Sequence, residues 1–278
     1  MKKSNIKIVF TDLDGTLLRQ DRQIGGRDLN TLHKLGKAGI NRVLATGRSL
    51  FSLRRVLPDD FPIDYVVFSC GVGCMDWRKK EILTSNTLPK KQVQKIIATL
   101  IEQEIDFMVH KPVPDNHHFH YHRARESNPD FDRRLSFYAD YGTPLKVNAV
   151  YSCDASQALA ILSDEGQFYQ ICEKLRNVRV IRTTSPLDHT SIWVEIFPEH
   201  VSKGHAAEWL CDHLSIPRNS SIGIGNDYND IELLEWTHYS FVVDNAPQEL
   251  RDRFNATSSN QCHGFSEVIY RKVFHYDE

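Results

Sequence analysis

The 278-residue sequence predicts an α/β fold, in which a doubly wound parallel sheet forms a core and an α+β domain is inserted into it. Short apolar, β-branched segments alternate with amphipathic segments near the N-terminus, and the same alternation returns near the C-terminus. Alternating strands and helices favour right-handed crossovers between parallel strands. The stretch between the two ends is too long for a loop. We therefore expect residues 1–84 and 191–278 to form the core, and residues 85–190 to form the inserted domain.

The N-terminal part contains three expected strands and two expected helices. Segment 6–11 (IKIVFT) is β-branched and apolar, as in a buried strand, and Gly15 follows it in a turn. Leucines recur at helical spacing in segment 28–38, and Gly39 ends that helix. The remaining elements expected here are a strand at 40–45, a short helix at 49–56 and a strand at 65–69.

The C-terminal part repeats this rhythm. Segment 203–214 places small and apolar residues on one helical face, so a helix is expected there. A strand at 221–225, a helix at 229–236 and a strand at 239–243 follow it. In the middle of the chain we expect helices at 89–103 and 166–176, and strands near 105–110, 145–151, 178–183 and 191–197.

The composition excludes several classes of protein. The chain is 41% hydrophobic and 25% charged with a formal net charge of −2, so no strong positive field attracts nucleic acid or an anionic membrane. No segment approaches the roughly 18 apolar residues of a membrane helix, and Asp12 interrupts the N-terminal apolar run too early for a signal peptide. Six scattered cysteines favour reduced thiols, and hence a cytoplasmic location.

Two carboxylates, Asp12 and Asp14, follow the first expected strand directly. Ligands of open α/β sheets bind at the carboxyl ends of the strands, and Gly15 lets the chain turn so that both acids face one crevice. Neighbouring carboxylates repel each other unless a cation or a proton lies between them, which implies a hard divalent ion. An isolated pair of this kind is more often only a polar strand end followed by a turn.

Three further elements strengthen the chemical interpretation. Thr46-Gly47-Arg48 follows the second expected strand, where a hydroxyl, a flexible glycine and a backbone N–H can cradle phosphate. Lys203 opens a helix, where its ammonium can neutralise a phosphoryl oxygen. The structural alternatives are a helix cap at Thr46 and a solvated lysine at position 203.

The last element is the segment Gly225-Asn226-Asp227-Tyr228-Asn229-Asp230, which follows the expected strand at 221–225. Amide and carboxylate oxygens at a strand end suit an oxygen-rich metal site. The alternative is a capped helix start, a part that Asp227 or Asn229 can also play.

These four motifs, DLDGT, TGR, SKG and GNDYND, occur in an order and at strand ends that resemble the haloacid dehalogenase superfamily. The long insert between TGR and SKG is similar to that of its Cof-type branch of sugar-phosphate phosphatases. The resemblance spans nearly the whole chain, with segment 191–196 similar to the strand that returns from cap to core. It implies a Rossmann-like core with a large α/β cap that sets substrate specificity.

The resemblance also implies a mechanism. Asp12 is the nucleophile that forms an aspartyl-phosphate, and Asp14 is the general acid and then the general base. The cofactor is Mg²⁺, bound by Asp12 and by the backbone carbonyl of Asp14. The metal-binding residues expected from the whole set are Asp12, Asp14, Asn226, Asp227 and Asp230, and the phosphate-binding residues are Thr46, Gly47, Lys203 and Asn229.

One position departs from the family pattern, which has an acid at the place of Asn226. An amide oxygen can ligate Mg²⁺ but brings no charge, so weaker metal binding is expected. Asp227, one position later, is the other candidate ligand, and the sequence does not decide between the two.

Histidines and cysteines form a second group of candidates. His118, His120 and His122 would share one face of a strand, where they could bind zinc, but such a trio lacks a fixed coordinating partner. We instead expect His118 and His120, together with Arg48, to contribute to substrate specificity. Cys70 and Cys74 are expected to be core or turn residues, because no second Cys/His pair has metal-finger spacing.

The sequence therefore predicts a Mg²⁺-dependent phosphomonoester hydrolase acting on a small phosphorylated metabolite such as a sugar phosphate. We expect a monomer or a weak homo-oligomer, with no nucleic acid or membrane partner. The alternatives are a phosphotransferase or mutase with the same intermediate, and a phosphate-binding regulatory protein that has lost turnover.

Overall fold

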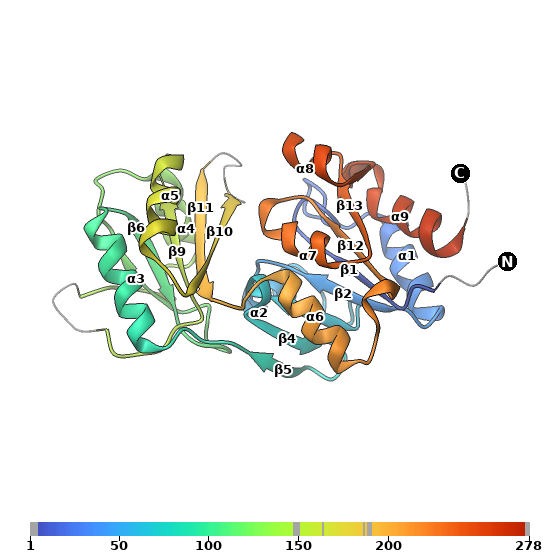
Figure 1. Cartoon of the computed structure of the whole chain (residues 1–278), viewed down its shortest axis with the longest axis horizontal. Helices are drawn as coiled ribbons and strands as arrows, with labels where there is room; N and C mark the ends of the chain where they lie inside the picture. The colour runs from blue at the N-terminus through green and yellow to red at the C-terminus, as the bar shows by residue number, and fades with distance from the viewer. Residues whose placement is uncertain (1–4, 147–150, 163, 186, 188–190, 276–278) are drawn as a thin grey trace. The chain divides into compact units, whose positions relative to one another are not determined.

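The computed structural model describes residues 5–146, 151–162, 164–185, 187 and 191–275. The chain divides into two compact units, each with its own sheet (Figure 1). The first, called here the core unit, consists of Met1–Thr84 and Ser202–Glu278. The second, called the inserted unit, is Ser85–Val201.

The core unit is built on an eight-stranded sheet with the order β14-β13-β12-β1-β2-β3-β4-β5. The five pairings from β14 to β3 are parallel, which confirms the predicted α/β class with a parallel sheet. Its strands are β1 (Ile8–Thr11), β2 (Asn41–Ala45), β3 (Tyr65–Phe68), β4 (Gly73–Asp76), β5 (Glu81–Ser85), β12 (Ser221–Gly225), β13 (Tyr239–Val243) and β14 (Asn255–Thr257).

The first strand occupies the middle of this sheet, between β2 and β12. All four of its residues are buried, as expected for a β-branched, apolar strand that is covered on both faces. Thr11 pairs with Leu44 on one side and with Ile224 on the other. The carboxyl ends of β1, β2 and β12 therefore end level with one another, and the segments that follow them start from one edge of the sheet.

Figure 1 shows α1, α6 and α7 against this sheet, and apolar residues of α6 and α7 pack with Ile8 and Phe10 of β1. The structure has α1 running to Lys37 and Gly39 adopting a left-handed φ of 73°, in agreement with the predicted stop. The helices are α1 (Gly26–Lys37), α2 (Leu50–Arg54), α6 (Lys203–His213), α7 (Ile231–Trp236), α8 (Gln248–Arg253) and α9 (Gly264–Ile269), which continues into a π-helical turn (Tyr270–Phe274).

The far edge of the core sheet differs from the prediction. Beyond β3 the chain reverses through a short 3-10 turn (Ser69–Gly71) and returns antiparallel as β4. Single-sequence patterns missed this reversal because β4 (GCMD) is short and carries neither β-branched residues nor alternation. The turn between β3 and β4 consequently lies at the carboxyl ends of the parallel strands.

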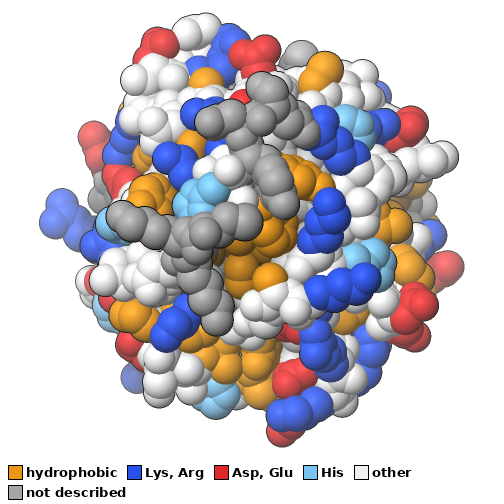
Figure 2. Space-filling view, turned by 90° about the vertical axis from the view of Figure 1, so that its right-hand side faces the viewer, with side chains coloured by type: hydrophobic (Ala, Val, Ile, Leu, Met, Phe, Trp, Pro, Cys, Tyr) orange, Lys and Arg blue, Asp and Glu red, His pale blue; other side chains and the backbone are white. Residues whose placement is uncertain are grey.

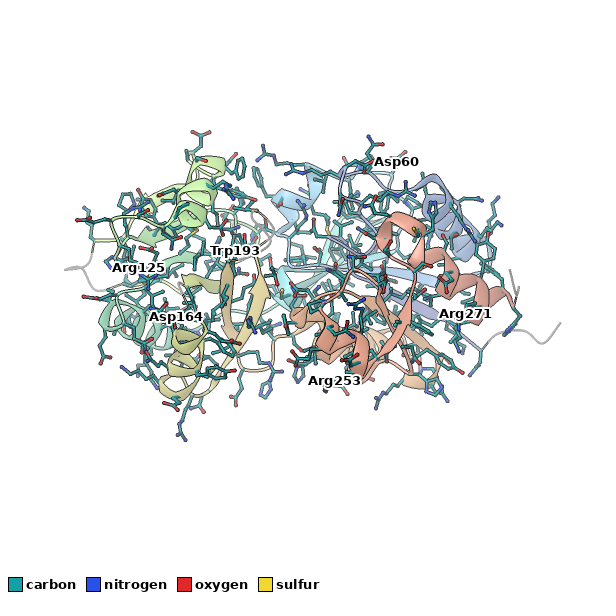
Figure 3. All side chains as sticks on the ribbon, turned by 90° about the horizontal axis from the view of Figure 1, so that it is seen from above. Asp60, Arg125, Asp164, Trp193, Arg253 and Arg271 are labelled. Carbon is teal, nitrogen blue, oxygen red and sulfur yellow. The ribbon has the colours of Figure 1, made fainter. Side chains whose placement is uncertain are left out.

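The inserted unit contains a six-stranded sheet with the order β10-β11-β9-β6-β7-β8, antiparallel except for β7 and β8. One face carries a core cluster that includes residues of α3 and α5, and the other carries a cluster built around α4. In the latter, Trp193 on β11, labelled in Figure 3, donates its Nε1–H to Asp130 at 2.5 Å. The elements are α3 (Lys90–Glu102), β6 (Asp106–His110), β7 (Phe119–His122), α4 (Pro129–Phe137), β8 (Gly142–Pro144), β9 (Gln157–Leu162), α5 (Glu165–Lys174), β10 (Val178–Thr184) and β11 (Ile192–Pro198).

Two expectations for this part of the chain need correction. The strand at 191–197 was assigned to the core, but β11 pairs with β9 and β10 inside the inserted unit, which therefore extends to Val201 rather than to residue 190. Of the strand expected at 145–151, residues 147–150 lie outside the described residues and the others are not in a strand. The central strand β9 was missed because QALAIL is a continuous apolar run with helix-favouring Ala and Leu.

Among the hollows on the described surface, two small ones lie away from the carboxyl edge of the core sheet. One, of about 380 Å³, is lined by Lys34, Lys37, Ala38, Tyr270 and Phe274. Figure 2 views this end of the core unit, where hydrophobic side chains lie among Lys and Arg side chains. The other, of about 400 Å³, is lined by residues 59–63 with Arg42, Trp77 and Arg78. Within the described ranges, no helix is long and apolar enough to cross a membrane.

Candidate active site

The predicted nucleophile lies at the edge where the parallel strands end. Asp12 directly follows β1, and its backbone N–H donates to the carbonyl of Ile224 on β12 at 2.9 Å. This bond extends the β1–β12 ladder by one residue, so the position of Asp12 is fixed by the sheet rather than by a loop. The side chain is buried, with 5% of its surface exposed.

A buried lysine holds this carboxylate. Lys203, at the start of α6, is completely buried and donates to Oδ1 of Asp12 at 2.7 Å and to Oδ1 of Asp230 at 2.6 Å. Its third bond goes to Oδ1 of Asn229 at 3.1 Å. An ammonium has three donors, so all of them are used. The alternative of a solvated lysine is therefore wrong.

The charged groups of this cluster shift one another's pKa values. Burial raises the pKa of Asp12 to about 8, with Asp230 and Asp14 adding to the rise and Lys203 opposing it. Burial alone would lower the pKa of Lys203, but the carboxylates of Asp12 and Asp230 outweigh it and raise that pKa above its ordinary value. Lys203 is thus a fixed cation, while Asp12 gains a proton more readily than an exposed aspartate does.

The second acid of the DLDGT motif lies in a tight turn. Gly15 has a φ of 80°, a left-handed conformation that favours glycine. A Cβ at position 15 would lie 2.6 Å from Nδ2 of Asn226, so the turn also needs a residue without a side chain. Arg48 holds the Asp14 carboxylate from the TGR motif, with Nε and Nη2 each 2.6 Å from one oxygen. Arg48 therefore contacts the predicted general acid.

The turn after β12 is organised by Asp230. This fully buried carboxylate accepts the backbone N–H groups of Asn226 and Asp227 through Oδ2, at 2.9 and 3.1 Å, and Lys203 through Oδ1. Both of its oxygens are engaged in this turn, and its expected role as a metal ligand stays a prediction. Gly225 is required beside it, because a Cβ there would lie 2.6 Å from Cβ of Asp230.

The two candidate ligands in this turn play different parts. Asp227 caps the 3-10 turn (Tyr228–Asp230), with Oδ1 accepting the backbone N–H of Tyr228 at 2.8 Å. Asn226 instead reaches across to the DLDGT loop. One end of its amide lies 2.9 Å from the hydroxyl of Thr16, 2.9 Å from the carbonyl oxygen of Asp14 and 3.2 Å from Oδ2 of Asp12.

This grouping fits a magnesium ion. With its oxygen at that end, Asn226 completes a set of three oxygens with the Asp12 carboxylate and the Asp14 carbonyl. Octahedral Mg²⁺ has ligands at about 2.1 Å, so adjacent ligand oxygens lie about 3 Å apart. The spacings of 2.9 and 3.2 Å match that requirement. Among the described residues, no group of three or more His, Cys, Asp or Glu side chains is arranged to hold a metal. The set described here is of a different kind, because two of its oxygens come from a backbone carbonyl and a side-chain amide.

The TGR motif follows β2 at the same edge. Thr46 is buried, and its Oγ1 accepts the backbone N–H of Arg48 at 3.1 Å. This bond belongs to the turn before α2, whose N-cap is Ser49, so Thr46 is not the helix cap considered as the alternative. A hydroxyl that accepts one bond can still donate another. A Cβ at Gly47 would lie 3.4 Å from Sγ of Cys70 and 3.6 Å from Nδ2 of Asn229, in ordinary contact. Phosphate binding by both residues stays a prediction.

Cys70 is a buried turn residue as predicted, but sequence reasoning missed its contact with the cluster. It is buried in the turn after β3 with a left-handed φ of 54°, next to Ser69 with a φ of 48°. Its Sγ accepts Nδ2–H of Asn229 at 3.5 Å, while Oδ1 of Asn229 accepts from Lys203. The amide of Asn229 connects Cys70 to Lys203, and its expected phosphate binding stays a prediction. The sequence signal was the position of Cys70 directly after a third strand end.

The histidines of the specificity prediction belong to the inserted unit. His120 lies on β7, and the ring of His118, just before that strand, is 5.2 Å from the ring of Tyr141. Burial lowers the pKa of His120 below its ordinary value, with Lys111 adding to the effect. Phe119 and Tyr121, which alternate with them, face the cluster around α4.

The sequence as a whole matches one family. A sequence profile of the haloacid dehalogenase-like hydrolases matches residues 9–269. The chain belongs to this family. A 5-amino-6-(5-phospho-D-ribitylamino)uracil phosphatase of Bacillus subtilis is 24% identical over 95% of this chain and 97% of its own length. An HMP-PP phosphatase of Yersinia enterocolitica is 26% identical over 88% of this chain and 86% of its own length.

Solved structures agree in fold. A phosphatase of the haloalkanoate (HAD) superfamily from Bacteroides thetaiotaomicron has a TM-score of 0.78 at 17% identity, over 98% of this chain and 97% of that one. A HAD subclass IIB sugar phosphatase has a TM-score of 0.77 at 16% identity, over 95% and 98% of the two chains. The resemblance to the Cof-type branch is confirmed, and this haloacid dehalogenase-like hydrolase is a phosphatase.

Proposed function

We propose that the enzyme is a Mg²⁺-dependent hydrolase of small phosphomonoesters that acts through an aspartyl-phosphate on Asp12. The observation that carries this proposal is the contrast between the two oxygens of Asp12. Oδ1 is held by the buried Lys203, whereas Oδ2 lies 3.2 Å from the end of the Asn226 amide that also contacts the Asp14 carbonyl. A carboxylate with one oxygen anchored and the other directed at a cation site is oriented for attack.

The first step transfers the phosphoryl group to the protein. An oxygen of Asp12 attacks phosphorus, a new P–O bond forms and the bond from phosphorus to the leaving oxygen breaks. Asp14 gives its proton to that oxygen. In the second step water attacks the phosphorus of the aspartyl-phosphate while Asp14 takes a proton, which restores the Asp12 carboxylate and releases inorganic phosphate.

Arg48 controls the availability of Asp14. In the structure both oxygens of Asp14 are paired with the Arg48 guanidinium. Proton transfer to the leaving group requires at least one of these bonds to open. The pair is partly exposed, with 24% and 37% of the two side chains accessible, so it is weak enough to open.

The negative charge of substrate and nucleophile must be compensated. Mg²⁺, held by Asp12, the Asp14 carbonyl and Asn226, would supply Lewis-acid stabilisation of the phosphoryl oxygens when bound. Lys203 adds a fixed positive charge beside the attacking carboxylate, and Thr46 offers a hydroxyl. Preorganised donors of this kind are worth about 10²–10³-fold each.

The names of the relatives support a substrate class. One of them is named for a phosphoribitylamino-uracil and another for HMP-PP, both small phosphorylated metabolites. We place the substrate of this enzyme in that class, with sugar phosphates as the leading candidates. The enzyme would act in the cytoplasm as a monomer or a weak homo-oligomer, without nucleic acid or membrane.

A phosphate-release screen tests the proposal. Sugar phosphates, nucleotides and cofactor phosphates are incubated with the protein and Mg²⁺, and an Asp12→Asn variant serves as the blank. Release above the blank for at least one small phosphomonoester is expected. Phosphate that appears on a second acceptor instead of in solution would assign a phosphotransferase or mutase. No turnover of any ester, including a generic aryl phosphate, would leave a phosphate-binding regulatory protein.

A further inference from the structure

We infer that the side-chain amide of Asn226 takes two orientations, with its nitrogen on the Asp12 and Asp14 oxygens when no cation is bound and its oxygen there when Mg²⁺ is bound. The inference rests on the proposed Mg²⁺ site. Its consequence is a site that is internally hydrogen-bonded without metal, so that the protein does not depend on Mg²⁺ for its folded structure.

The contacts of Asn226 permit both orientations. With nitrogen at the inner end, the amide donates to the Asp14 carbonyl at 2.9 Å and to Oδ2 of Asp12 at 3.2 Å. With oxygen there, the same two distances become those between neighbouring ligands of one cation. A half-turn about the Cβ–Cγ bond exchanges the two ends of the amide without displacing any other heavy atom.

Thr16 accommodates either orientation. Its hydroxyl lies 2.9 Å from the inner end of the amide and is almost completely buried. A hydroxyl can accept from the amide nitrogen or donate to the amide oxygen by rotating its hydrogen. The buried neighbour of Asn226 is thus satisfied in both states.

The backbone of Asn226 stays fixed while the amide turns. Its N–H donates to the buried Asp230 at 2.9 Å, so the exchange needs no movement of the loop. Gly15 leaves room for the outer end of the amide, which would lie only 2.6 Å from a Cβ at that position. The change is therefore confined to one side-chain dihedral.

An aspartate at this position would behave differently. Both of its ends are acceptors, so the inner oxygen would face the Asp14 carbonyl and the Asp12 carboxylate with only the Thr16 hydroxyl as donor. Without metal these groups repel each other, and with Mg²⁺ the extra charge strengthens binding. The Asn226→Asp variant should therefore exchange metal-independent stability for tighter metal binding.

The test measures Mg²⁺ binding and stability without any substrate. Wild type, Asn226→Asp, Asn226→Ala and a charge control, Asn219→Asp, are melted in EDTA and in MgCl₂ and titrated with MgCl₂ by calorimetry. Asn219 is exposed and precedes β12, at the opposite end of that strand from the site. In EDTA, Asn226→Asp should melt lower than wild type by about 2–4 °C or more. Its Mg²⁺ affinity should be at least about tenfold higher, the equivalent of one pKa unit of interaction.

The alanine variant and the amide resonances complete the test. Asn226→Ala loses both the donor and the ligand, so it should melt lower in EDTA and bind Mg²⁺ more weakly than wild type. Asn219→Asp should match wild type in both measurements. In ¹⁵N-asparagine-labelled wild type, the side-chain NH₂ resonances that disappear in Asn226→Ala should shift during the MgCl₂ titration, with the midpoint that calorimetry gives.

Several results would overturn the inference. One is a melting temperature of Asn226→Asp in EDTA that is equal to or higher than that of wild type. The others are an Asn226→Ala variant that binds Mg²⁺ with wild-type affinity, and Asn226 amide resonances that do not shift when Mg²⁺ is added. If the melting, titration and resonance results come out as expected but the phosphate-release screen fails, only the proposed hydrolysis is refuted. Normal turnover with static amide resonances would refute only the two orientations.

Discussion

At the scale of single residues, the site depends on one buried cation. Lys203 lies between Asp12 and Asp230, and each of its bonds fixes a different group, namely the nucleophile, the organiser of the β12 turn and the Asn229 amide. A buried ion pair contributes little net stability while it is intact, but the loss of one partner leaves uncompensated buried charge. The lysine therefore matters for folding as well as for catalysis.

Replacement of Lys203 by methionine should reveal both roles. The Asp12 and Asp230 carboxylates then lie buried without a cation, so the free energy of unfolding should fall by about 3–5 kcal/mol in urea denaturation. Phosphate release should fall by about 10²–10³-fold under conditions where the variant is folded. Lys7→Met, at an exposed lysine of the same unit, is the control. A stability loss within the range of that control would contradict the structural role.

The raised pKa of Asp12 leads to a prediction about pH. Burial, with help from Asp230 and Asp14 and against Lys203, raises this pKa to about 8, so metal-free Asp12 takes up a proton more readily than an exposed aspartate. Mg²⁺ needs the ionised carboxylate, so its binding should release a proton below about pH 8. The apparent affinity should therefore rise with pH and level off above that value.

Calorimetry in two buffers of different ionisation enthalpy measures this release. At pH 7 the observed binding enthalpy should depend on the buffer by an amount that corresponds to part of one proton, and at pH 9 the dependence should disappear. The Asp12→Asn variant, which has no such proton, should show no buffer dependence at either pH. A wild-type enthalpy that is the same in both buffers at pH 7 would show that Asp12 is already ionised without metal.

At the scale of elements, the parallel strands bring distant segments to one edge, and the turns after them direct the side chains. The turn after β1 needs Gly15 for its conformation and for space, and the turn after β12 is held by Asp230. The turn after β3 places Ser69 and Cys70 in left-handed conformations next to Asn229. Non-glycine residues in that conformation cost free energy, and they are typical of functional sites.

A comparison of two glycines distinguishes the cost of a left-handed backbone conformation from the cost of steric contact. Gly15 and Gly39 have similar left-handed φ values of 80° and 73°, but a Cβ at Gly39 would meet nothing within 4 Å, whereas one at Gly15 would lie 2.6 Å from Asn226. Gly39→Ala should therefore cost only the backbone strain of about 1–2 kcal/mol. Gly15→Ala should cost more and should also weaken Mg²⁺ binding and phosphate release. Thermal melts and Mg²⁺ titrations of both variants check this, and equal losses with unchanged Mg²⁺ affinity in both would contradict it.

At the scale of the whole molecule, the sequence predicts elements that have a local signal, and it misses features that depend on the pairing of strands. The strand at 6–11 and the helix α1 could be predicted, because the hydrophobic pattern of the sequence matches the residues that are buried there. The membership of β11 could not be predicted, since only its hydrogen bonds to β9 and β10 assign it to the inserted unit. Strand β9 has no alternation because all six of its residues are buried.

The same limit applies to the site. The order of four motifs predicted Asp12, Asp14 and Lys203 at one sheet edge, since strand ends meet there in any open α/β sheet. The sequence did not decide between Asn226 and Asp227 as candidate ligands, because that depends on which side chain makes the hydrogen bonds of the turn. In the structure Asp227 accepts the backbone N–H of Tyr228. Cys70 meets Asn229 across 159 positions of sequence, a distance over which no local pattern carries information.

The division into two units suggests that chemistry and selectivity can be changed independently. The described groups proposed for phosphoryl transfer belong to the core unit, whereas His118 and His120 belong to the inserted unit. If the inserted unit selects the substrate, the double variant His118→Ala/His120→Ala should change the ranking of kcat/KM across a panel of sugar phosphates. An imidazole that hydrogen-bonds a substrate hydroxyl discriminates by about 0.5–1.5 kcal/mol, so changes of about two- to tenfold between substrates are expected.

Turnover of a generic aryl phosphate provides the internal reference, because it has no sugar hydroxyl for these histidines to recognise. Its kcat should stay close to that of wild type, and so should its Mg²⁺ dependence. His33→Ala, at an exposed histidine of the core unit, should leave the whole ranking unchanged. A double variant that lowers kcat/KM for all substrates by the same factor would mean that the histidines stabilise the inserted unit without contacting the substrate. An unchanged ranking at full activity would remove them from substrate recognition.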